Sequence, residues 1–245
     1  MGVSNATLVI IAGGLAGGFV NGLTGMGTAL TALGIWLHVL PPAIAAPLVV
    51  LCSVVGQLQN LPSLWHTIDR HRVAPFIASG IFGVPIGTRL LGLVPVGSLK
   101  LLIGGFLIAF CSFMLFANRR LTIRWGGRFA DACIGLVGGI LGGLAGLSGA
   151  LPTMWASVRG WSKDERRGVF LAFNLTVLSF AFVSFAVSGF IDEAFFAAAL
   201  TAVPATIAGA FLGFQVYRRL NDWHFERVVL FLLLASGGSL AWSNW

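Results

Sequence analysis

Glycines and neutral polar residues gather at two places in this chain, and their types suit the binding of an anion. The first place reads GLTGMGT over residues 22–28, and the second reads GLAGLSG over residues 143–149. Glycine lets an anion approach backbone N–H groups closely, and a nearby hydroxyl can donate one more hydrogen bond. Neither stretch holds an acid or a base, so the chemistry expected here is binding, and no enzyme activity is predicted.

The candidate binding residues carry no charge. Those of the first stretch are Asn21, Thr24, Gly25, Gly27 and Thr28. Those of the second stretch are Gly146, Ser148, Gly149 and Thr153. Ser53 and Asn174 coincide when the sequence is shifted by 121 residues, so both are expected to face the same site. The alternative is that the glycines serve close helix packing and that the hydroxyls bond back to their own helices.

A stripe of glycines spaced four apart precedes each stretch. The stripes consist of Gly14, Gly18 and Gly22 and, 121 residues later, Gly135, Gly139 and Gly143. Such spacing lets a second helix backbone approach closely. Past each stripe the helix is expected to fail, because glycine costs about 1 kcal/mol relative to alanine at each helical position. Two breaks in corresponding positions of an apolar chain point to a transporter binding site.

The composition places the chain in a membrane. Of its 245 residues, 57% are hydrophobic and only 9% are charged, with a mean hydropathy of +0.93. This excludes a soluble globular domain. The formal charge is +7, and the arginines that produce it stand in short loops between apolar segments. There they indicate the orientation of the chain in the membrane and not nucleic-acid binding. The N-terminus has no basic region before its apolar run, so no cleaved signal peptide is expected. The three cysteines stand singly inside apolar segments, and neither a metal nor a cofactor is predicted.

Eight segments are long and apolar enough to be membrane helices, which need about 20 residues. Two units are predicted, 1–120 and 121–245. The first holds segments 7–37, 43–61, 73–92 and 98–117. The second holds segments 132–158, 167–189, 194–216 and 225–243. Gln57 comes late in its segment and is expected at the membrane interface, as are tryptophans near segment ends such as Trp36. Pro152 fits the first turn of a short helix after the second break.

The basic residues favour inverted units. If all eight segments cross, the fifteen Lys and Arg residues divide six against nine. If segments 7–37 and 132–158 are re-entrant hairpins, only Arg89 and Lys100 remain on one side and thirteen lie on the other. The second division is the one that the positive-inside rule expects. The predicted fold is therefore an all-α integral membrane protein of two inverted repeats. Each repeat has a glycine-broken re-entrant hairpin and three transmembrane helices, and both termini are periplasmic.

The repeated sequences resemble the TauE/SafE sulfite exporter family, also called the TSUP permeases. The resemblance rests on GGFVNGLTGMGTAL from Gly17 and GGILGGLAGLSGALP from Gly138, with later GxxxG-like turns at Gly83–Gly87 and Gly209–Gly213. It covers almost the whole chain. It implies the export of sulfite or of a small sulfur-containing organic anion across the bacterial inner membrane.

The resulting hypothesis is a secondary transporter with a midplane anion site between the two hairpin tips. Export suits an inside-negative membrane, which favours outward movement of one negative charge by about 2.3 kcal/mol per 100 mV. An importer or channel for similar anions, and a membrane scaffold without transport, are the alternatives. The expected partners are the anion and the lipid bilayer, and the sequence leaves a homo-oligomer open.

Overall fold

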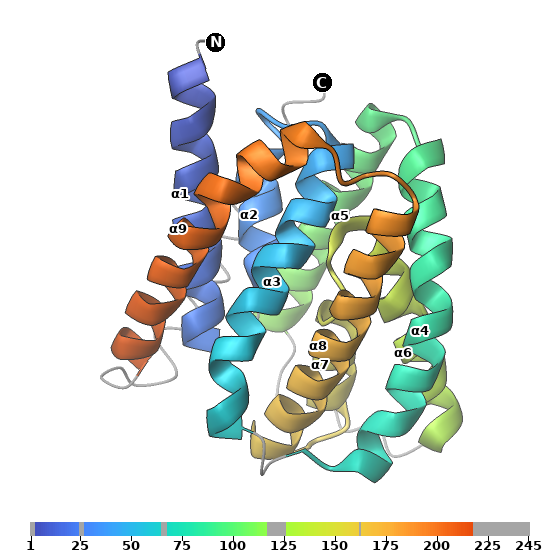
Figure 1. The fold of residues 1–245 in the computed structure, drawn as a ribbon. Coiled ribbons are helices and arrows are strands. Elements are labelled where there is room, and N and C mark those ends of the chain that lie inside the picture. The colour runs from blue at the N-terminus through green and yellow to red at the C-terminus, as the bar shows by residue number, and fades with distance from the viewer. Residues whose placement is uncertain (1–2, 25–26, 65–67, 117–125, 162, 218–245) are drawn as a thin grey trace.

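The chain is all α-helical over the residues that its computed structural model describes, which are 3–24, 27–64, 68–116, 126–161 and 163–217. The helices of the described part are α1 (Val3–Thr24), α2 (Thr28–Trp36), α3 (Pro42–Leu64), α4 (Arg70–Leu93), α5 (Val96–Phe116), α6 (Gly127–Ala145), α7 (Ala150–Val158), α8 (Lys163–Val187) and α9 (Glu193–Tyr217). They form one bundle with roughly aligned axes (Figure 1). The predicted last segment, 225–243, lies outside the described residues.

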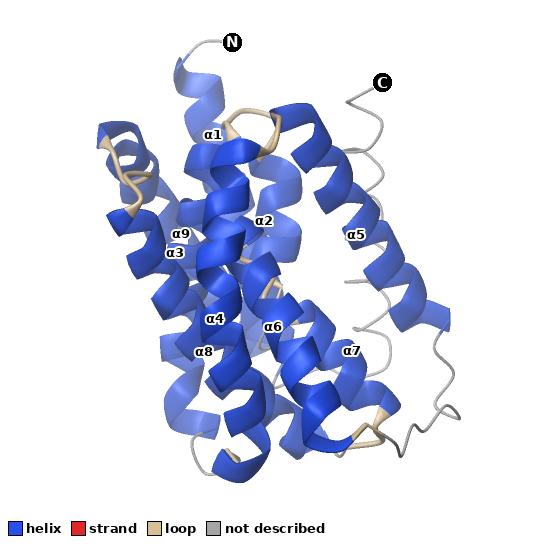
Figure 2. Cartoon of the chain, turned by 90° about the vertical axis from the view of Figure 1, so that its right-hand side faces the viewer, coloured by secondary structure: helices blue, strands red, loops and turns tan. Residues whose placement is uncertain are grey.

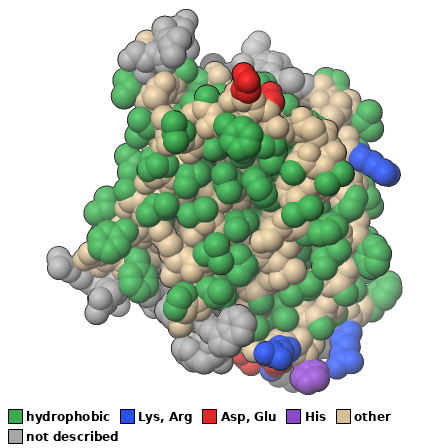
Figure 3. Space-filling model, viewed as in Figure 1, with side chains coloured by type: hydrophobic (Ala, Val, Ile, Leu, Met, Phe, Trp, Pro, Cys, Tyr) green, Lys and Arg blue, Asp and Glu red, His purple; other side chains and the backbone are tan. Residues whose placement is uncertain are grey.

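Six of the described helices are long and apolar enough to cross a membrane: α1, α3, α4, α6, α8 and α9. The visible face has hydrophobic side chains across its middle and charged side chains toward its ends (Figure 3). The chain is therefore an all-α, multi-pass integral membrane protein, as predicted. This set of six includes α1 and α6, for which the sequence predicted only re-entrant arms.

Helix breaks occur at both predicted stretches. Helix α1 has 22 residues and is followed by the nine-residue α2, and α6 has 19 residues and is followed by the nine-residue α7. Figure 2 shows the short loop after α6. Gly27 and Gly146 have φ angles of 107° and 69°. These left-handed conformations are unfavourable for other residues, and they turn the chain at the two breaks.

The long arm of each hairpin packs along a helix of the other predicted unit. Helix α1 lies beside α9, and α6 lies beside α4 (Figure 1). A Cβ atom added at Gly18 would overlap the carbonyl of Thr206, and one at Gly139 would overlap the carbonyl of Gly80. The facing helices also have glycines at these contacts, Gly83 and Gly87 on α4 and Gly209 and Gly213 on α9. Cβ atoms added to these glycines would likewise overlap backbone. The prediction that the glycine stripes permit close backbone approach is confirmed.

A tryptophan ties the short arm of each hairpin to its long arm. The Trp36 Nε1–H donates to the carbonyl oxygen of Ile10 at 3.0 Å, and the Trp155 Nε1–H donates to Asp131 Oδ1 at 2.7 Å. The two acceptor residues are 121 positions apart, which is the repeat spacing. Trp36 is completely buried, so its predicted place in an interfacial belt is wrong. Gly13 leaves room for its indole ring.

Candidate anion-binding site

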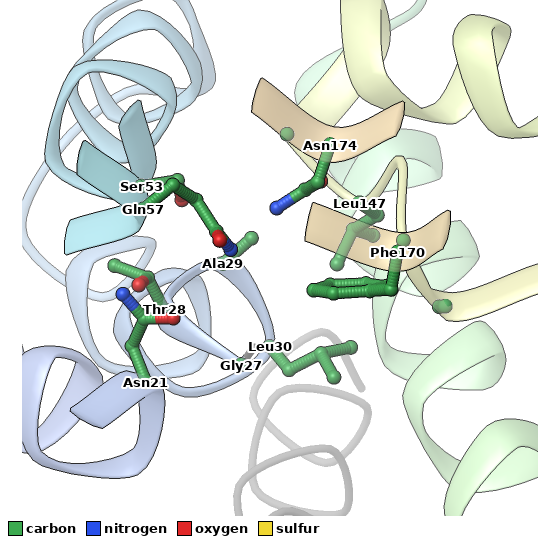
Figure 4. Close-up of a pocket in the computed structure, with 13 residues that line it drawn as sticks. Asn21, Gly27, Thr28, Ala29, Leu30, Ser53, Gln57, Leu147, Phe170 and Asn174 are labelled. Carbon is green, nitrogen blue, oxygen red and sulfur yellow. The ribbon is translucent and has the colours of Figure 1, made fainter. Parts of the chain in front are cut away.

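The two hairpin tips meet at one cavity. It has an empty volume of about 320 Å³, including space open to solvent. The residues that line it come from both predicted units: Asn21, Gly27, Thr28, Ala29, Leu30, Ser53, Gln57, Gly146, Leu147, Gly149, Ala150, Phe170 and Asn174. Figure 4 shows them around the central space. None of these residues carries a charge.

The first turn of α2 directs backbone donors to this cavity. Gly27 precedes α2 without a capping side chain, and its carbonyl accepts the N–H of Thr31 at 2.9 Å. The N–H groups of the three residues in between, 28–30, have no acceptor inside the helix, as at every helix N-terminus. All three residues line the cavity. The positive end of the helix dipole adds to these donors in attracting an anion.

The first turn of α7 offers fewer donors. Here the Gly149 carbonyl accepts the N–H of Thr153 at 3.1 Å, and Ala150 is the first helical residue. Pro152 stands in this first turn, as predicted, and proline has no N–H. The backbone donors of the cavity are therefore more numerous at the tip of the first hairpin.

Asn174 presents an amide donor to the cavity. Its Oδ1 accepts a hydrogen bond from the Ser148 hydroxyl, and this bond leaves the Nδ2 group directed into the central space (Figure 4). Ser148 is fully buried and is not part of the cavity wall. It therefore positions Asn174 from behind.

Asn21 is a completely buried amide on the cavity wall. Its Nδ2 and Oδ1 atoms have no hydrogen-bond partner within the described part of the chain. A buried polar group left in this state costs about 1–3 kcal/mol. A ligand in the cavity, which Asn21 lines together with Thr28 and Ser53, would relieve this cost.

Seven of the eleven predicted binding residues line the cavity: Asn21, Gly27, Thr28, Ser53, Gly146, Gly149 and Asn174. Ser148 lies behind the wall, as described above. The Thr153 hydroxyl bonds back to the Gly149 carbonyl of its own helix at 2.8 Å, which is the packing alternative considered for the hydroxyls. The Thr24 side chain and Gly25 lie outside the described residues.

Six wall residues are not among those predicted from the sequence: Ala29, Leu30, Leu147 and Ala150 lie at the two breaks, and Gln57 and Phe170 lie on α3 and α8. Gln57 was expected at the membrane interface, but it is buried with only 1% of its surface exposed, and it lines the cavity. Phe170 stands in an apolar run of α8 and is not among the predicted residues. Each stands four residues from a predicted residue on the same helix, Gln57 from Ser53 and Phe170 from Asn174. Residues four apart share a helix face, so this spacing could have identified both.

The wall can bind an anion through neutral donors: backbone N–H groups, amides and hydroxyls. Over the described residues, no group of His, Cys, Asp and Glu could hold a metal ion. The fold and this cavity define a multi-pass membrane protein with a buried polar site between two broken helices. Helix breaks around a polar site inside a membrane protein are typical of transporters.

The comparison with protein families agrees with this class. The family model described as "Sulfite exporter TauE/SafE" matches residues 9–240, so the chain belongs to the TauE/SafE family of membrane transporters. Comparisons with curated proteins and with solved structures give no match. The resemblance recognised in the glycine repeats is confirmed.

Proposed function

We propose that this protein exports a small sulfur oxyanion, sulfite or a short sulfonate, across the bacterial inner membrane. The observation that carries the proposal is the uncharged cavity between the N-termini of α2 and α7, where Asn21 and Asn174 add amide donors. Neutral donors bind an anion without fixing it as firmly as a lysine or arginine would, and a transporter must also release its substrate. Family membership supports the type of anion.

We further propose that 1–120 and 121–245 are inverted repeats. Helix α1 starts at one end of the bundle and α6 starts at the opposite end (Figure 1). The reciprocal pairs α1–α9 and α4–α6, and the tryptophan contacts at residues 10 and 131, support this arrangement. With most basic residues cytoplasmic, both termini are periplasmic.

The direct test is sulfite flux in proteoliposomes at a defined membrane potential. The protein should accelerate the release of internal sulfite relative to protein-free vesicles, and an inside-negative potential should increase the rate because a negative charge leaves. Thr28→Val should slow the flux, since it removes a hydroxyl from the cavity wall. Thr31→Val is the matched control: it removes a buried hydroxyl from the same helix, away from the wall, and should leave the flux unchanged.

Three results would count against the proposal. Release at the protein-free rate for sulfite and for short sulfonates would favour the scaffold alternative. Rates that reach the single-channel range and show no saturation with concentration would favour an anion channel. Equal effects of Thr28→Val and Thr31→Val would place the substrate path outside this cavity.

A further inference from the structure

The cavity wall is divided into a polar side and an apolar side. Asn21, Thr28, Ser53 and Gln57, from the first predicted unit, lie on one side of the central space in Figure 4. Phe170 and Leu147 lie on the other side, and the side chain of Leu30 extends toward them. Asn174 directs its amide from the apolar side toward the polar one. A ligand bound here therefore meets more hydrogen-bond donors at one end and more hydrocarbon at the other.

The division follows from differences between the two repeated sequences. Under the 121-residue shift, Asn21 corresponds to Gly142 and Gln57 corresponds to Leu178. Ser53 and Asn174 are a corresponding pair of which both members are polar. In addition, the first residue of α2 is Thr28, whereas the first residue of α7 is Ala150. Of the polar side chains on the first side, only Ser53 therefore has a polar counterpart on the second.

Phe170 is the largest apolar group on the wall. It corresponds to Val49 under the same shift, and Val49 is buried without lining the cavity. The ring of Phe170 packs directly on Gly149, where an added Cβ atom would overlap it. Phe170 is 7% exposed. Because Phe170 and Asn174 stand one helical turn apart on α8, the amide and the ring face the same cavity.

We infer that the site takes an anion with one oxyanion head and a short apolar tail, such as a sulfonate of one or two carbons, and that Phe170 sets the permitted tail length. This inference rests on the proposed function of the same cavity. The head binds to the polar side and to the Asn174 amide, and the tail lies against Phe170, Leu30 and Leu147. A symmetric oxyanion with no apolar part is less well matched on the Phe170 side, because its oxygens lose water there and gain fewer donors than on the polar side.

The test is to measure, by isothermal titration of the purified full chain, the dissociation constants of methane-, ethane-, propane- and butanesulfonate and of sulfite. In the parent protein, butanesulfonate should bind at least tenfold more weakly than the best of the shorter sulfonates, because about one methylene of misfit in an apolar pocket has this effect. Phe170→Ala should move the preferred tail to greater length, and Phe170→Trp should move it to shorter length. Phe173→Leu is the control, because Phe173 is a fully buried ring of the same helix that does not line the cavity. It should keep the parent order.

The outcomes separate this inference from the function on which it rests. Binding of sulfite with no measurable binding of any sulfonate to the parent would overturn the inference and leave the proposed function standing. So would sulfonate affinities that are independent of chain length, or Phe170 variants that weaken all four sulfonates by the same factor. If the parent binds neither sulfite nor any sulfonate, the proposed function fails first. Opposite shifts in the Ala and Trp variants support the inference.

Discussion

Individual polar side chains around the cavity have distinct roles. Asn21 and Asn174 offer amide groups to the cavity, whereas Ser148 lies behind the wall and bonds to Asn174. The glycines at the breaks have a different importance. Gly146 has a φ of 69°, and an added Cβ atom would lie 2.9 Å from Val49 Cγ1. Valine at position 146 would therefore disturb the fold, and the polar side chains are the better means to test binding.

Ser148→Ala should weaken sulfite binding although Ser148 does not line the cavity. The substitution frees the Asn174 amide to rotate, and a lost hydrogen bond of this kind costs about 1–2 kcal/mol. Asn174→Ala should cost at least as much. The double variant should be no weaker than Asn174→Ala alone, because the two residues act as one unit. Titration calorimetry measures all three.

The control for these three variants is Thr176→Val, which lies on α8 like Asn174. The Thr176 hydroxyl is exposed and bonds back to the Ala172 carbonyl at 2.8 Å, so its removal should leave sulfite affinity unchanged. Additive losses in the double variant would mean that Ser148 contacts the anion itself.

At the scale of the helices, the glycine stripes explain how the long arms are held. Along the α4–α6 contact, glycines on each helix face backbone of the other, for example Gly139 against Gly80 and Gly87 against Ile140. Lipid tails are as apolar as the helices, so close van der Waals contact between backbones is a main source of stability here. The breaks at the tips depend on these contacts, because they hold the ends of α1 and α6 next to the cavity.

Gly139→Ala should lower the melting temperature of the protein in detergent. The new methyl group would overlap the Gly80 backbone, and overpacking of this kind typically costs about 1–3 kcal/mol. Gly92→Ala is the matched control on the other helix of the pair, where the added methyl meets only Phe190 at 3.6 Å. It should be neutral or slightly stabilising, since alanine favours helix. Equal melting temperatures for the two variants would show that the stripe contact is not tight.

At the scale of the whole molecule, the two hairpins determine which connections lie at the same end of the bundle. Helix α6 starts and α7 ends at the same end of the bundle (Figure 1), because α7 turns back after the break at Gly146. Helix α8 then crosses to the other end. The starts of α6 and α8, with their basic residues, therefore lie at the same end of the bundle, which is the cytoplasmic end in the proposed topology.

Cysteine labelling in intact cells should follow this topology. In a background without the three native cysteines, Arg128→Cys and Lys163→Cys should react only after the membrane is made permeable. Ser188→Cys, which lies beyond the far end of α8 and is exposed, should react with a membrane-impermeant reagent in intact cells. Labelling of Arg128→Cys and Lys163→Cys from opposite sides would rule out the second hairpin.

The sequence by itself determined the class of fold, the helix breaks and most of the cavity. Composition alone requires a membrane protein, and the glycines past each stripe weaken the helix at that point, because the cost of glycine in a helix is local. The repeat spacing of 121 residues also identified Ser53 and Asn174 as corresponding residues, and both line the cavity. These features can be predicted because they depend on composition, on residues next to one another in the sequence, or on the repeat spacing.

Only the tertiary structure decided which side chains of the apolar helices face inward. A soluble helix reveals its buried face by hydropathy, but a membrane helix is apolar toward both lipid and protein. The sequence therefore could not show that Trp36 is buried against Ile10, and it points to Gln57 and Phe170 only through their spacing from Ser53 and Asn174. It also could not separate Ser148, which lies behind the wall, from Asn174, which lies on it, because that distinction arises from how α7 and α8 pack.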